Sequence, residues 1–187
     1  MSTIQWYISA LGGPLQLLGF APYALAILRG ETKPKKATWL IWGAVDAVLI
    51  SGMYAANLLN AQMVAAMVGV FAIVYLAFKY GEAGWTLVDA ICLIGAALGI
   101  LLWISFDNPV LAVITSCTVL WIGAIPTFGN AWLYPEKEDR VAWTIFASAG
   151  LCTVIGIPAL TFAEIVQPLT FFLIDAIILA LVLLRSR

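Results

Sequence analysis

Two aspartates stand in the middle of long apolar stretches and are the residues best suited to chemistry in this chain. Asp46 lies near the centre of the stretch 37–57, and Asp175 lies near the centre of the stretch 166–184. An acid at the centre of a bilayer costs about 2.5–3.5 kcal/mol on insertion scales, so such groups usually face a partner, water or a substrate path. Neither has a Lys or Arg at a matching depth. Each carboxyl can act as a proton-coupling group, or can form a neutral hydrogen bond between helices.

Aromatic and amide side chains accompany these acids. Trp39, Trp42 and Asp46 are spaced three and four residues apart, which places them on one face of a helix. Aromatic rings beside a carboxylate suit a neutral ring or a cation, although Trp39 and Trp143 also fit simple anchoring at a membrane interface. Gln16 and Asn130 are further hydrogen-bonding candidates. The predicted substrate-binding residues are Asp46, Asp175, Trp42, Asn130 and Gln16.

Other kinds of site have little support. The chain contains no histidine, which excludes His-ligated metal sites and His-based acid–base catalysis. Cys92, Cys117 and Cys152 stand alone in apolar stretches without CxxC spacing. The formal net charge of −1 indicates no basic surface for nucleic acid. We therefore expect no enzyme activity, no metal, no cofactor and no nucleic-acid partner.

The composition indicates a membrane protein. Of the 187 residues, 64% are hydrophobic and 10% are charged, against about 45–50% and 25% in ordinary soluble domains. A helix of about 20 residues crosses a hydrocarbon layer of about 30 Å, so a chain of 187 residues has room for about seven such helices. Polar or turn-forming breaks separate the expected spans, including breaks at Arg29–Lys36, Tyr134–Arg140 and Glu164–Pro168. The spans are 4–28, 37–57, 61–79, 84–105, 109–133, 141–163 and 166–184.

The basic residues specify an orientation. With seven spans, all nine Lys and Arg follow spans one, three, five and seven, and none lies on the opposite side. Cytoplasmic loops carry the excess of Lys and Arg. We therefore expect a multi-pass protein of the cell inner membrane, with the N-terminus outside and the C-terminus in the cytoplasm.

The chain also matches itself at an offset of 104 residues. Pro22 falls on Pro126, Lys36 on Arg140 and Trp39 on Trp143 without a gap. The first and last three spans then form two parallel copies of a three-helix unit, an architecture used by transporters. The expected fold is an all-α membrane protein with seven transmembrane helices in a parallel 3+1+3 repeat. Its units are 1–80 and 107–187, with 81–106 as a linker helix.

Each unit carries a proline inside its first span. Pro22 and Pro126 should kink these helices, because proline lacks an amide donor and clashes with the carbonyl four residues earlier. Such kinks suit hinges that alternately open the two ends of a central path, or they are static packing features.

A three-helix unit duplicated around one linker, with an outside N-terminus and a proline in the first helix of each unit, resembles the SWEET and PQ-loop superfamily. The segments Pro22–Gly30 and Lys33–Trp42 look like a bacterial branch of unassigned substrate. The family's Pro-Gln dipeptide is absent, since Tyr23 and Thr127 follow the two prolines. Relatives transport sugars, vitamins, amino acids or nicotinamide riboside.

The resemblance and the repeat together imply a small-molecule transporter that works by alternating access, with proton coupling as an option. The alternative is a membrane ligand-binding or sorting receptor on the same scaffold, without transport. The expected partners are a small-molecule substrate and the lipid bilayer, and a homo-oligomer is compatible with the sequence.

Overall fold

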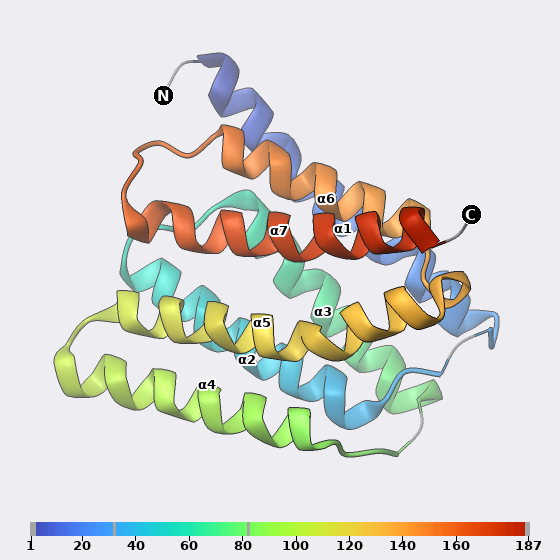
Figure 1. The fold of residues 1–187 in the computed structure, drawn as a ribbon. Helices are drawn as coiled ribbons and strands as arrows, with labels where there is room; N and C mark the ends of the chain where they lie inside the picture. Colours follow the sequence, from blue (N-terminus) through green and yellow to red (C-terminus); the bar gives the residue numbers. More distant parts are fainter. Residues whose placement is uncertain (1–2, 32, 82, 186–187) are drawn as a thin grey trace.

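The computed structural model describes residues 3–31, 33–81 and 83–185, and within them the chain is helical (Figure 1). Six of its helices are long and apolar enough to cross a membrane. The expectation of an all-α, multi-pass membrane protein is therefore confirmed. The elements are α1 (Thr3–Leu28), α2 (Lys36–Ala55), α3 (Ala61–Tyr80), α4 (Leu87–Phe106), α5 (Pro109–Leu133), the short 3-10 helix η1 (Pro135–Lys137), α6 (Arg140–Ile155) and α7 (Phe162–Arg185).

The last two helices differ from the sequence-based boundaries. α6 has 16 residues and ends at Ile155 instead of reaching 163, so at 1.5 Å per residue it is about 24 Å long. Gly156 follows it, and Pro158 cannot continue the helical hydrogen bonding. α7 begins at Phe162 and contains Pro168. The predicted break at Glu164–Pro168 is wrong, because the chain turns earlier, around this Gly and Pro.

Side-chain caps explain why several helices begin where they do. Asn60 accepts a hydrogen bond from the Met63 amide before α3. Thr86 and Asp89 form a reciprocal capping box at the start of α4, and Asp139 accepts from two amides before α6. These caps satisfy amides that have no partner inside the helix. Asp89 therefore has a structural role here.

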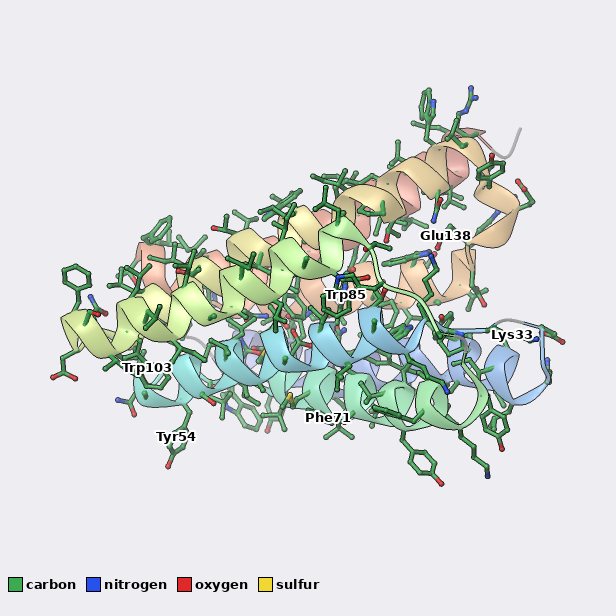
Figure 2. All side chains as sticks on the ribbon, turned by 90° about the horizontal axis from the view of Figure 1, so that it is seen from below. Lys33, Tyr54, Phe71, Trp85, Trp103 and Glu138 are labelled. Atoms are coloured by element: carbon green, nitrogen blue, oxygen red, sulfur yellow. The ribbon has the colours of Figure 1, made fainter. Side chains whose placement is uncertain are left out.

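The connections alternate between the two ends of the bundle (Figure 1). The α1–α2, α3–α4 and α5–α6 connections lie at one end with the end of α7, and the remaining connections lie at the other end with the start of α1. Lys33 and Glu138 mark the first end and Tyr54 and Trp103 lie toward the second (Figure 2). Every Lys and Arg in the described part of the chain is in these first connections or the adjoining helix turns. We call this the basic end.

The helices pack in a defined order around the centre. α3 packs against α1 and α2, and α7 packs against α5 and α6. α1 also contacts α6, and α2 contacts α5, while α4 packs only against α2 and α5. The buried centre includes Leu49, Met63 and Val113, which have no exposed area. Many large apolar side chains on the outside are exposed, as expected for helices that face lipid.

Candidate functional site: a cavity between six helices

A cavity of about 130 Å³ lies inside the bundle. Its lining residues come from α1, α2, α3, α5, α6 and α7, and none comes from α4. On α2 and α6 they lie between the first turn and the middle of the helix, from Trp39 to Asp46 and from Trp143 to Phe146. Both helices start at the basic end. The cavity therefore extends from the middle of the bundle toward that end.

Two carboxylates line the cavity without a compensating charge. Asp46 of α2 is only 3% exposed, and its Oδ1 is buried with no hydrogen-bond partner among the described residues. Asp175 of α7 lines the same cavity, and its Oδ2 is likewise buried without a partner there. No Lys or Arg from the described residues lines the cavity. A buried polar group without a partner is costly, so protonation or contact with a ligand would stabilise either carboxyl.

Aromatic rings form much of the wall. Phe20 of α1 and Phe146 of α6 meet edge to face with centroids 5.0 Å apart, and Trp143 lies 5.8 Å from Phe146. Glycines make room for this contact: a Cβ at Gly19 would collide with the Phe146 ring, and one at Gly69 with the Phe20 ring. The glycines therefore let α1 approach α6 and α3 closely enough for these rings to form the wall.

Trp39 and Trp42 add two more rings from the first turns of α2. Trp39 stacks at a tilt on Tyr23 with centroids 5.3 Å apart. The Trp42 ring lies against Gly123 of α5, where a Cβ would be 3.4 Å from it. Both units of the expected repeat therefore present tryptophan to one cavity.

Amide side chains lie between the cavity and the end opposite the basic end. Gln62 Nε2 donates to Gln16 Oε1 over 3.1 Å, and Gln16 lines the cavity. Nearer the far end, Asn60 Nδ2 donates to Gln167 Oε1 over 2.7 Å. This second bond joins the α2–α3 connection to α7, which are separated by more than 100 positions in the sequence.

A third acid supports the aromatic wall from outside the helices. Trp143 Nε1 donates to Glu138 Oε2 over 2.9 Å. Burial raises the pKa of the Glu138 carboxyl, and the indole hydrogen bond partly opposes this rise. Glu138 lies at the basic end (Figure 2), so it holds Trp143 at the level where α6 begins.

The structure brings together four of the five predicted substrate-binding residues. Gln16, Trp42, Asp46 and Asp175 all line the cavity. Asn130 does not: it is exposed near the end of α5. A position one turn beyond Pro126 is therefore not enough to face the cavity, because α5 turns this side chain outward. Its neighbour three residues earlier, Thr127, lines the cavity instead.

The predicted hinges lie inside their helices and outside the cavity lining. Pro22 is half-buried in α1 and Pro126 is exposed in α5. α1 contains a second internal proline, Pro14, and α7 contains Pro168.

Sequence reasoning missed several residues around the site. Trp39 and Trp143 line the cavity, although their positions also fit interfacial anchoring, and Phe20 lines it without any sequence pattern that marks it. The amides of Gln62 and Gln167 were also overlooked, although both stand in apolar stretches and are almost completely buried. A glutamine in such a stretch is itself a signal, because its amide must find a partner away from water.

Comparison with known proteins adds no family assignment. No protein-family model matches the chain, and neither the curated proteins nor the solved structures contain a significant match. The function is therefore inferred from the site itself.

Proposed function

We propose that this protein is a small-molecule membrane transporter that works by alternating access between the units 1–80 and 107–187. The cavity carries this proposal, because all six helices of the two units contribute to its lining and the linker helix α4 does not. A cavity at the interface of two repeated units is the place where a substrate can be exposed first to one side and then to the other.

The cavity lining supports the repeat. Five pairs of lining residues are separated by 104 positions, the offset at which the sequence matches itself. Two of the pairs are aromatic in both units, and a third is aliphatic in both. The pairs are Gln16 with Leu120, Phe20 with Ala124, Trp39 with Trp143, Trp42 with Phe146, and Val70 with Ile174.

The helix packing supports it too. Exchanging α1, α2 and α3 for α5, α6 and α7 turns the α1–α3 contact into α5–α7 and the α2–α3 contact into α6–α7. The same exchange turns α1–α6 into α5–α2, and this contact is also present. Two copies of one unit that face each other across an axis would have these contacts.

Packed side chains close the cavity toward the end opposite the basic end. Toward the end opposite the basic end, Leu49, Met53 and Met63 fill the centre with at most 1% exposure. The Asn60–Gln167 hydrogen bond ties the two units together there. We interpret these contacts as a closed gate, and Pro22 and Pro126 as the hinges that allow it to open.

The same proposal includes a relationship to the SWEET and PQ-loop superfamily and a cytoplasmic position for the basic end. The grouping of Lys and Arg at one end supports this orientation in the inner membrane, with the N-terminus outside.

Counterflow in proteoliposomes tests the proposal. Vesicles loaded with unlabelled sugars, nucleosides, vitamins, amines or amino acids would be diluted into labelled solute, with and without a pH gradient. Saturable, protein-dependent exchange of one class is expected, and a gradient effect would indicate proton coupling. Tight binding without any exchange would contradict transport and favour a ligand-binding or sorting receptor.

A further inference from the structure

We propose that the ligand of the central cavity is a small organic cation, such as a substituted or quaternary ammonium. It names the substrate class of the proposed transporter and therefore rests on the proposed function. It depends on three features of the cavity: two unpaired acids, walls of aromatic rings, and a small volume.

The charge of the lining favours a cation. Asp46 and Asp175 are its ionisable acids, and no Lys or Arg of the described chain lies beside them. Each carboxylate keeps one buried oxygen without a hydrogen-bond partner in the described structure. An anionic ligand would add a third like charge to a site that has no cation, whereas a cation supplies the charge that the chain lacks.

The walls favour a cation whose charge is covered by carbon. The rings of Trp39, Trp42, Trp143 and Phe146 line the cavity together with those of Phe20 and Phe171. The faces of Trp and Phe attract ammonium groups, most strongly where water is excluded. A substituted ammonium also buries its methyl or methylene groups against such walls.

Other ligand classes fit the lining less well. A hard inorganic cation such as Ca²⁺ requires about six to eight oxygen ligands, and the lining offers few oxygens besides the two carboxylates. Within the described residues, no group of three or more Cys, Asp or Glu is placed to hold a metal. A polyol would leave most of its hydroxyls unpaired against the aromatic and aliphatic walls.

The size of the cavity limits the ligand further. Its volume of about 130 Å³ is close to that of an engineered apolar cavity of roughly 150 Å³ that binds benzene. In this conformation the site therefore suits a molecule of about that size. Choline meets this limit and carries a quaternary ammonium.

The two acids come from different units and from positions that are not equivalent in the repeat. Asp46 matches Gly150 at the offset of 104, and Asp175 matches Phe71. Phe71 is exposed at the outer surface (Figure 2) and does not line the cavity. One cation held by both carboxylates would thus connect the first unit to the second. This arrangement couples binding of the ligand to the relative position of the units.

A pair of probes with the same shape tests the charge requirement. Choline and its neutral carbon analogue 3,3-dimethylbutan-1-ol would be titrated into the purified full-length protein by calorimetry. Choline is expected to bind at least about tenfold more tightly. Asp46→Asn and Asp175→Asn should each weaken choline by about tenfold and leave the neutral analogue unchanged. Asp107→Asn is the matched control, because Asp107 is exposed in the α4–α5 connection and far from the lining.

The outcomes separate this inference from the proposed function. Equal binding of the two probes, no choline binding, or unchanged choline affinity in both folded variants would overturn the cation site. The comparison of choline with the neutral analogue on the wild-type protein tests the charge requirement even if a variant fails to fold. Exchange of neutral solutes in counterflow without choline binding would leave the transporter standing and remove the cation. Charge-dependent choline binding without exchange of any solute would keep the cation site and remove transport.

Discussion

Several polar side chains in this protein are buried among apolar helices, away from water, where each needs a hydrogen-bond partner or a ligand. Gln62 and Gln167 are almost completely buried, and each has a side-chain hydrogen bond to an amide on another element. Gln62 Oε1, Gln167 Nε2 and one oxygen each of Asp46 and Asp175 have no partner in the described chain, but of these four residues only the two acids line the cavity. The amides therefore hold helices together, while the acids remain available to a ligand.

Glu138 gives a pH-dependent prediction at the level of one residue. Its pKa is raised in the folded protein by burial, so the folded state binds this proton more tightly than the unfolded state. The contribution of Glu138 to stability is then largest at low pH and falls as the pH rises from the ordinary pKa through the raised one. Glu138→Gln cannot ionise but keeps an oxygen that accepts from Trp143.

We expect the melting temperature of Glu138→Gln, minus that of the wild type, to increase as the pH is raised from about 4 to 7. Thermal unfolding in detergent, followed by tryptophan fluorescence, measures this difference, and the subtraction removes the titration of the other acids. A difference that stays constant with pH would mean that burial does not raise the pKa of Glu138.

At the level of elements, the close crossing of α6 and α7 depends on glycine. A Cβ at Gly150 would lie 2.7 Å from the Cα of Phe172, and this backbone atom cannot move without displacing α7. We expect Gly150→Ala to lower the free energy of unfolding by about 1–3 kcal/mol, as for other overpacked sites. Denaturant titration in mixed micelles measures the change.

Gly129→Ala is the control for this prediction. Gly129 is also helical, in α5, but a Cβ there would meet no atom within 4 Å. Its replacement should be neutral or stabilise the protein by up to about 1 kcal/mol, through helix propensity alone. If both alanine variants lose the same stability, close packing of α6 on α7 is not the reason.

For the whole molecule, the position of the basic end predicts which loops can be labelled. In a variant with Cys92, Cys117 and Cys152 replaced by alanine, single cysteines would be placed at Leu59 and Glu136, at opposite ends of the bundle. A membrane-impermeant maleimide should label position 59 in intact cells, and position 136 only after permeabilisation. Labelling of position 136 alone in intact cells would reverse the proposed orientation.

The gate interpretation predicts the effect of locking the two units together. Asn60→Cys and Gln167→Cys, in the same cysteine-free background, would be joined by a short bifunctional methanethiosulfonate reagent. Cross-linking should abolish exchange in counterflow, and a reducing agent should restore it, because the end held by the Asn60–Gln167 bond could no longer open. The Asn60→Cys single variant controls for modification alone. Undiminished exchange in the cross-linked protein would show that this contact is not a gate.

The membrane character, most helix boundaries and the grouping of positive charge follow from the amino-acid sequence alone. These properties depend on composition and on local breaks such as Asn60 and Tyr134, so they need no knowledge of packing. Asp46 and Asp175 can also be selected from the sequence, because an acid within a long apolar stretch is rare and usually functional.

Which side of each helix faces the centre depends on how the helices pack together. The helices are apolar on almost every side, and lipid is as apolar as a protein core, so hydrophobic periodicity does not separate the two. This is why Asn130 was expected in the cavity and lies outside it, while Trp143 was considered an anchor and lines the cavity. The Asn60–Gln167 bond joins residues more than 100 positions apart, and only the packed bundle brings such residues together.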